Sequence, residues 1–305
     1  MALWVAFTYL RLPHAEALAT QNPESTALIE ARAEEALAEG KAPRRRQNWV
    51  SLRAIARSAV DAVVLAEDAA FYQHEGVDTQ ELRKAVEESW EKGSLGRGAS
   101  TITQQLAKNL WLSNDRSLLR KGKELILARR LESALSKERI LTLYLNVVEW
   151  GNGVYGIGAA AREHFGVHPS ALSPAQSAIL AAMLPSPRKR LPRLKGARLY
   201  RYASTILARM EAVGRLDRER ALKARQELSA FFGKALPEKP TAQEEAEAEA
   251  EENSEAVPGA PTPEPTPEPS VEPDPPEAPP APEAEPATEN EVLPQQDSPS
   301  DAALE

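Results

Sequence analysis

The composition of the last 65 residues excludes a packed core there. Residues 241–305 contain 19 acidic residues, 15 of the 25 prolines of the chain, and no lysine or arginine. So acidic and proline-rich a segment cannot bury enough apolar surface to offset the conformational entropy of the chain. We therefore expect a disordered tail over 236–305, and we expect the folded body to lie before it.

The remaining body carries the opposite charge. Its 240 residues include 37 basic and 26 acidic residues, a net charge of +11. Such a body suits an anionic partner, which can be a nucleic acid, an anionic bilayer or a phosphorylated substrate, and a solvated basic surface explains the charge equally well. The chain has no cysteine. Disulfides, thiolate metal sites and a thiol nucleophile are thereby excluded.

The first ten residues are uncharged and mostly apolar. As a helix they would extend about 15 Å, against a hydrocarbon core of about 30 Å. They also lack the basic start and the small-residue cleavage site of a secretory signal. We expect residues 1–48 to form a membrane-proximal segment that begins with the distal half of a transmembrane anchor. A short buried or interfacial helix is the alternative.

Helical periodicity dominates from residue 49 to residue 235, with few alternating runs that would predict strands. The sequence therefore predicts one mainly all-α domain over 49–235. A further helix is expected over 23–40, with Asn22 as its cap and Gly40 as its stop. Ser173 caps another predicted helix, which Pro185 ends.

One acid points toward the predicted core. Apolar residues from Val60 to Phe71 recur at helical spacing, and Glu67 and His74 continue the same face. A partly desolvated carboxylate has a raised proton affinity and suits a general base, whereas a buried acid with a structural hydrogen bond is the alternative. His74 has no second ligand at metal spacing, so we expect it to be structural.

A second acid, Glu124, shares a helical face with leucines, and Arg120 and Lys121 lie one turn earlier. Two inward acids on separate helices form the pair that glycosyl chemistry uses. An intrahelical salt bridge is the simpler explanation for Glu124.

A glycine-rich run at 93–98 leads into a predicted helix that begins near Ser100. Free N–H groups at a helix N-terminus, with cations nearby, suit a pyrophosphate. A capping box between Thr101 and Gln104 is the structural alternative. Residues 151–156 match the spacing of a dinucleotide fingerprint, but they follow a helical pattern, so we interpret these glycines as packing and turning residues and expect no organic cofactor.

With these residues identified, the chain resembles the family 51 glycosyltransferases of peptidoglycan synthesis, especially their monofunctional branch. Five motifs occur in the family order, and they occupy 67–78, 98–109, 120–124, 137–146 and a glycine segment that ends at 159–166. The resemblance covers about 49–187 and continues more weakly to about 232. Thr142 and Gln176 replace glutamates that are usual elsewhere in the family.

The resemblance implies a lysozyme-like helical fold and an enzyme that polymerises lipid II into β-1,4-linked glycan with release of undecaprenyl pyrophosphate. Glu67 would act as general base in an inverting reaction, with Glu124 as the second catalytic acid. The residues that would surround the pyrophosphate, directly or through a divalent cation (Mg²⁺ or Mn²⁺), are Lys108, Arg116, Arg120, Lys123 and Glu124. Those that would orient it are Ser100, Gln104 and Gln105.

The resemblance also implies a place on the periplasmic face of the bacterial inner membrane. The expected partners are lipid II, the growing glycan strand, the membrane and other cell-wall synthesis proteins, and no nucleic acid. A lysozyme-like or lytic glycan-cleaving enzyme and a non-catalytic cell-wall scaffold are the alternatives. The cationic helix favours synthesis, because a cleaver of finished glycan meets no pyrophosphate.

Overall fold

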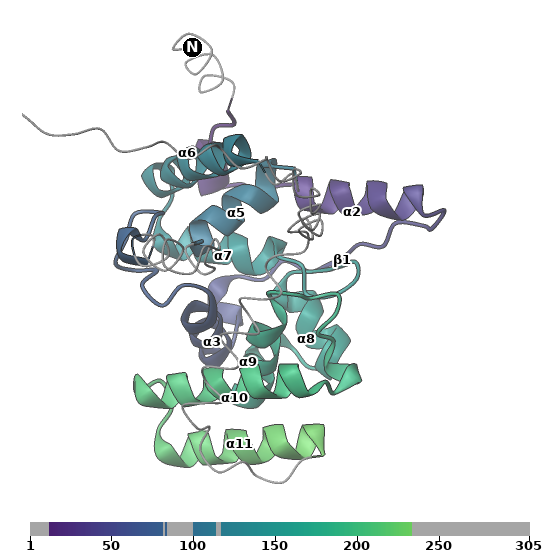
Figure 1. Ribbon diagram of the computed structural model, residues 1–305, viewed down its shortest axis with the longest axis vertical. Helices are drawn as coiled ribbons and strands as arrows, with labels where there is room; N and C mark the ends of the chain where they lie inside the picture. Colours follow the sequence, from purple (N-terminus) through teal and green to yellow (C-terminus); the bar gives the residue numbers. More distant parts are fainter. Residues whose placement is uncertain (1–11, 82, 84–99, 114–116, 234–305) are drawn as a thin grey trace, which may run out of the picture. The chain divides into compact units, whose positions relative to one another are not determined.

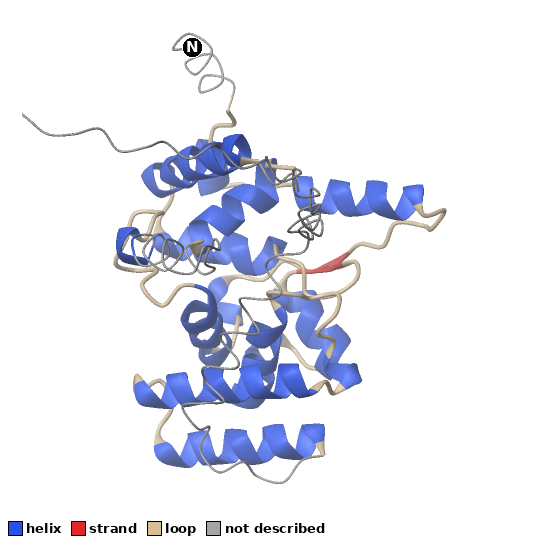
Figure 2. Ribbon diagram, in the orientation of Figure 1, coloured by secondary structure: helices blue, strands red, loops and turns tan. Residues whose placement is uncertain are grey.

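Helices form almost all of the regular structure in this protein (Figures 1 and 2). The computed structural model describes residues 12–81, 83, 100–113 and 117–233, which belong to one compact unit. Its α-helices are α2 (Ala27–Ala38), α3 (Arg57–Glu67), α5 (Ile102–Trp111), α6 (Leu118–Ala134), α7 (Lys137–Val147), α8 (Ile157–Phe165), α9 (Pro174–Met183), α10 (Ala197–Ala212) and α11 (Arg218–Phe232). Short 3₁₀ helices occupy Glu16–Ala19, Leu52–Ala54, Pro169–Ala171 and Pro192–Leu194. The predicted mainly all-α fold is confirmed.

Two groups of helices share one apolar core. Helix α5 packs against α2, α6 and α7, whereas α9 packs against α3, α10 and α11 (Figure 1). The largest fully buried side chains include Trp150, Tyr144 and Phe71, with the leucines of α6 and α7 around them. Burial of this apolar surface supplies most of the stability of the fold. It also fixes α5 against both the end of α3 and the face of α6.

The only strand pairing among the described residues is minimal. Strand β1 (Arg46–Gln47) runs parallel to β2 (Val154–Tyr155). Gly153, at φ +71°, lies so close to β1 that a Cβ atom there would be 2.6 Å from the Arg44 carbonyl oxygen. Gly156 has φ +77°, and its Cβ would be 2.6 Å from the Asn146 carbonyl oxygen. The predicted packing and turning role of these glycines is confirmed.

The prediction of one helical face that runs from Val60 through His74 is wrong. Helix α3 ends at Glu67, and Asp68 leaves the helical region with φ −167° and ψ 76°. Its carboxylate accepts hydrogen bonds from His74 at 2.9 Å and from the backbone N–H of Ile102 at 3.0 Å. These buried contacts with the start of α5 replace a further turn of helix.

Helix α2 also begins later than predicted. Thr26, rather than Asn22, is its N-cap, because the Thr26 hydroxyl accepts a hydrogen bond from the Ile29 N–H at 3.2 Å. Asn22 instead accepts a hydrogen bond from Arg139 at 2.9 Å. The predicted stop at Gly40 agrees with the end of α2 at Ala38, and the predicted capping box of Ser173 is confirmed.

The described part of the N-terminal segment packs on the helical body. Leu12, Ala15 and Leu18 are buried in the main core. Arg130 donates to the Leu12 carbonyl at 2.8 Å, and Arg139 donates to the Leu18 carbonyl at 2.7 Å. Within the described ranges, no helix is long and apolar enough to cross a bilayer. The predicted partial anchor at 1–10 and the predicted disordered tail lie outside the described residues.

Candidate active site

Glu67 is the last residue of α3, and a chain of two hydrogen bonds orients its carboxylate. Gln105 of α5 donates from Nε2 to Glu67 Oε2 at 2.7 Å, and the Tyr144 hydroxyl donates to Gln105 Oε1 at 2.9 Å. Because the amide oxygen of Gln105 is occupied by Tyr144, its NH₂ group must face Glu67. Burial raises the pKa of Tyr144, and the charges of Glu67 and Asp68 raise it further. Tyr144 therefore remains a donor at neutral pH.

Glu124 lies on the inner face of α6 with only 3% of its surface exposed. Arg120 Nη1 donates to its Oε2 at 2.5 Å, and Lys121 Nζ donates to its Oε1 at 2.5 Å. A buried carboxylate is stable only when it is paired and hydrogen-bonded. The two cations one turn earlier satisfy that requirement, so the predicted intrahelical salt bridge and the predicted inward acid are both present.

Lys121 connects the two helices of the site. Besides Glu124, its ammonium group donates to Ser100 Oγ at 2.9 Å and to Gln104 Oε1 at 2.9 Å. The N-terminal end of α5 is thereby held against α6. Two consecutive residues of α5 therefore connect the two acids of the site. Gln104 bonds Lys121, the partner of Glu124, and Gln105 bonds Glu67.

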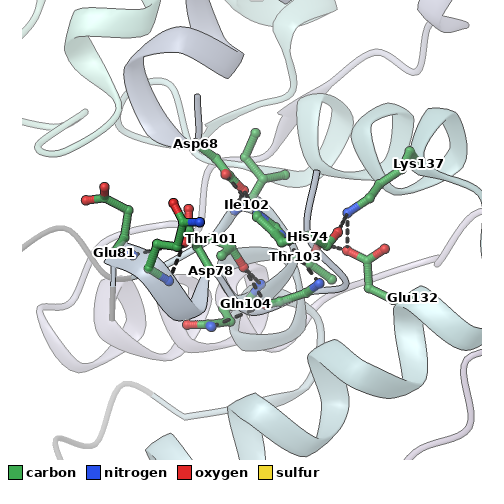
Figure 3. Close-up of polar contacts among 12 residues, drawn as sticks. Asp68, His74, Asp78, Glu81, Thr101, Ile102, Thr103, Gln104, Glu132 and Lys137 are labelled. Carbon is green, nitrogen blue, oxygen red and sulfur yellow. Dashed lines mark hydrogen bonds and ion pairs between the residues drawn. The ribbon is translucent and has the colours of Figure 1, made fainter. Parts of the chain in front are cut away.

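A second polar network fixes the start of α5 to the loop that follows α3 (Figure 3). The Asp68 carboxylate bonds both His74 and the Ile102 N–H, and Thr101 Oγ1 donates to the Gly76 carbonyl at 2.8 Å. Burial raises the pKa of Asp68, and the hydrogen bonds from His74 and Ile102 oppose that shift. His74 is structural, as predicted. No cluster of metal-binding side chains occurs in the part of the chain that the structure describes.

The same network continues to α6 and α7. Lys137 Nζ donates to the His74 carbonyl at 2.6 Å and to Glu132 Oε1 at 2.8 Å, and Glu132 also accepts from Thr103 Oγ1 at 2.6 Å (Figure 3). Three helices and the loop after Glu67 are therefore joined by buried or half-buried polar contacts. This rigid support holds Gln105 in register with Glu67.

The side chains around Glu124 carry a net positive charge, because Lys108, Arg120 and Lys121 lie near a single acid. Burial lowers the pKa of Lys108, Glu124 opposes that shift, and the charges of Arg120, Lys121 and Arg32 add to it. Arg120 Nε is buried without a hydrogen-bond partner among the described residues. An unmade buried hydrogen bond costs about 1–3 kcal/mol. An anionic ligand beside α6 would relieve the repulsion among Lys108, Arg120 and Lys121.

Comparison with known proteins identifies the family. The sequence model of the transglycosylase family, described as "Transglycosylase", matches residues 33–211, which is more than half of the chain. The chain belongs to the transglycosylase family. The match begins within α2 (Ala27–Ala38) and ends within α10 (Ala197–Ala212).

Curated relatives of this transglycosylase support the same family assignment. The biosynthetic peptidoglycan transglycosylase of Azoarcus sp. is 47% identical over 192 residues, which cover 63% of this chain and 82% of the relative. That of Thiobacillus denitrificans is 44% identical over 188 residues, which cover 62% and 81%. That of Nitrosomonas eutropha is 42% identical over 195 residues, which cover 63% and 78%.

The transglycosylase fold brings most of the predicted site residues together. Glu67 and Gln105 form one contact, and the other predicted residues around Glu124 on α5 and α6 are Ser100, Gln104, Lys108 and Arg120. Lys123 is half-buried on α6 beside Glu124, and its side chain forms no hydrogen bond with a described residue. Arg116 and the glycines at 93–98 lie outside the described residues.

The sequence predicted Lys121 only as a partner of Glu124, from their i, i+3 spacing. It did not predict that Lys121 also holds Ser100 and Gln104, or that Tyr144 orients Gln105. No local pattern connects Tyr144 with Gln105, because 39 positions separate them.

Proposed function

We propose that this transglycosylase polymerises lipid II into β-1,4-linked glycan strands and releases undecaprenyl pyrophosphate. The observation that carries the proposal is the half-buried Glu67 carboxylate, which Gln105 of α5 holds. On the α6 side of α5, Lys108, Arg120 and Lys121 form a cationic cluster around Glu124. A base and an anion site together suit transfer of a sugar from a diphosphate to a hydroxyl group.

In the proposed step, Glu67 removes the proton from the 4-hydroxyl of the acceptor sugar. The acceptor oxygen then bonds to the anomeric carbon of the donor, and the bond from that carbon to the pyrophosphate oxygen breaks. The electron pair leaves with the pyrophosphate, and the configuration of the carbon is inverted because attack comes from the face opposite the leaving group. The hydrogen bond from Gln105 Nε2 orients the Glu67 carboxylate for this proton transfer.

The cations on α5 and α6 stabilise the charge that develops on the departing pyrophosphate. Arg120 and Lys121 are fixed by ion pairs with Glu124 before the reaction, so little reorganisation is needed. Glu124 serves by holding Arg120 and Lys121 in place. A divalent cation fits this donor set poorly, because both oxygens of Glu124 already accept hydrogen bonds from cations. Arg120 and Lys121 supply the charge that a metal would bring.

We also propose that the enzyme acts on the outer face of the inner membrane, since its substrate carries a lipid that stays in the bilayer. Residues 1–48 would then supply part of an anchor and its connection to the catalytic body, and the tail would meet other cell-wall proteins. Fractionation of cells that express the full-length gene product tests this placement. Recovery of the protein in the cytosol would contradict it.

The decisive experiment compares wild type with Glu67→Gln on labelled lipid II, followed by sizing of the product. Wild type should form polymer, and Glu67→Gln should fold normally yet lose activity about 10²- to 10⁴-fold, the usual contribution of a general base. As the control for folding, the variant should have the same circular dichroism spectrum and melting temperature as wild type. Shortening of pre-made glycan without polymer would favour a lytic enzyme instead.

A further inference from the structure

A cavity of about 640 Å³ lies outside the hydrogen-bond network of the catalytic residues. Its walls come from α2, from the glycine turn before β2 and from the segment that follows α9. The polar lining consists of Arg32, Asn152, Arg188, Lys189 and Arg193, together with Ser186. Its apolar lining consists of Pro185, Pro187 and Leu191. A volume of this size is typical of sites for small organic groups.

The charges of this cavity do not balance. Arg32 donates to Glu149 at 3.0 Å and to Glu35 at 2.8 Å, and Arg188 donates to both Glu35 oxygens at 2.9 Å. The hydrogen bonds from Arg188 and Arg32 lower the pKa of Glu35, which therefore stays ionised. Two acids thus neutralise two arginines.

Two further cations remain. Lys189 and Arg193 line the cavity, and neither forms an ion pair with a residue that the structure describes. Their net charge of two, in a cavity that two prolines and a leucine also line, is a combination suited to an anion on an aliphatic framework. A neutral sugar would not require it.

The cavity is electrostatically connected to the catalytic cluster. Arg32 lies on α2, which packs against α5 (Figure 1). Its charge contributes to the lowered pKa of Lys108. The cavity therefore borders a helix that packs on α5, which carries Gln104, Gln105 and Lys108.

We propose that this cavity binds the carboxylates of the peptide that the glycan carries, and so makes the enzyme selective for peptide-bearing substrate. This inference rests on the proposed function, because peptide-substituted glycan is the substrate of that reaction. Lys189 and Arg193 would take the carboxylates, while Pro185, Pro187 and Leu191 would contact the aliphatic part of the peptide. Arg32 and Arg188, fixed by Glu35, would give the site its shape.

The kinetic test uses the full chain and two forms of lipid II, one with free peptide carboxylates and one with all of them amidated. For wild type, amidation should raise KM roughly tenfold at unchanged kcat, as expected for the loss of a charge-assisted contact. The double variant Lys189→Gln and Arg193→Gln should show the higher KM with either substrate. The matched control, Arg218→Gln with Arg220→Gln on α11, removes the same charge at exposed positions and should behave as wild type.

A binding test without catalysis separates this proposal from the proposed function. A soluble disaccharide-peptide without pyrophosphate should bind wild type and the α11 control but not the cavity variant, by calorimetry. Equal KM for the two substrates, or equal fragment binding by all three proteins, would overturn the proposal even if polymer forms. Loss of binding to anionic vesicles in the cavity variant, with fragment binding retained, would assign the cavity to lipid headgroups and also overturn it. Absence of polymer from wild type would refute the proposed function. The binding of the disaccharide-peptide would still show whether the cavity takes the peptide.

Discussion

Gln105 sets the geometry on which Glu67 depends, and Tyr144 sets the orientation of Gln105. The hydroxyl of Tyr144 is its only polar side-chain atom, and it donates to the Gln105 amide at 2.9 Å. Without that donor the amide group of Gln105 can rotate, and its NH₂ group no longer has to face Glu67. The positioning of the base therefore depends on a residue that does not touch it through a hydrogen bond.

The variant Tyr144→Phe should lower kcat about fivefold, since a hydrogen bond of this kind contributes about 1 kcal/mol. KM should change little, because Tyr144 does not contact the cationic cluster. Steady-state polymerisation of labelled lipid II measures both constants. Tyr200→Phe, which removes a long hydroxyl contact with Ser229 on the distant α10–α11 pair, is the matched control. Equal loss in the two variants would argue against a positioning role.

Lys108 illustrates a conflict between stability and binding. Burial lowers the pKa of Lys108, so the folded state binds its proton less tightly than the unfolded state does. Below the folded pKa the charged lysine therefore costs stability, and that cost disappears as the pH rises through the folded pKa toward the ordinary lysine value. A contact with an anionic ligand explains why the site contains a cation that destabilises the fold.

We expect Lys108→Met to raise the melting temperature by a few degrees at neutral pH and to weaken polymerisation strongly through KM. Removal of a desolvated charge explains the first effect, and loss of a pyrophosphate contact explains the second. Thermal unfolding with and without inorganic pyrophosphate measures both: the anion should stabilise wild type more than the variant. A variant that is less stable than wild type and still responds fully to pyrophosphate would refute this account.

At the scale of elements, the N-terminal segment acts as part of the fold. Arg139 of α7 donates to the Leu18 carbonyl at 2.7 Å, to the Gln21 carbonyl at 2.8 Å and to Asn22 Oδ1 at 2.9 Å. Leu18 itself is buried against the core. Residues 12–22 are therefore held on α6 and α7.

Arg139→Ala should lower the free energy of unfolding by about 2 kcal/mol, because three hydrogen bonds from one charged group are lost in a partly exposed place. Urea unfolding followed by circular dichroism measures the change. Arg53→Ala removes an exposed arginine of the Leu52–Ala54 turn and serves as the control. An unchanged midpoint in Arg139→Ala would mean that the segment is not held by these contacts.

Element boundaries show what local pattern misses. The pattern from Val60 to His74 is helical, yet α3 stops at Glu67 because Asp68 finds better partners in His74 and Ile102. The start of α2 at Ala27 follows from a cap at Thr26, whereas Asn22 is taken by Arg139. In both cases a tertiary hydrogen bond outweighs a local preference of less than about 1 kcal/mol per residue.

For the whole molecule, the charge separates into a body of +11 and an acidic tail. Deletion of residues 241–305 should leave polymerisation in detergent within about twofold of wild type, since the site residues all precede the tail and its composition cannot form a core. Initial rates on labelled lipid II, at equal concentrations of folded protein, measure the effect. An inactive truncated enzyme would mean that the tail takes part in catalysis or folding.

The sequence alone determined the helical class, the inward direction of Glu67 and Glu124, and the cations on α5 and α6. These features repeat at short spacing, so local periodicity and charge reveal them. Only the tertiary structure decided that Lys121 joins Ser100 to Glu124, that Tyr144 orients Gln105, and that Arg32 and Arg193 share one cavity. Such contacts join positions tens to more than a hundred residues apart. Packing of the core determines them, and no local preference of the chain encodes them.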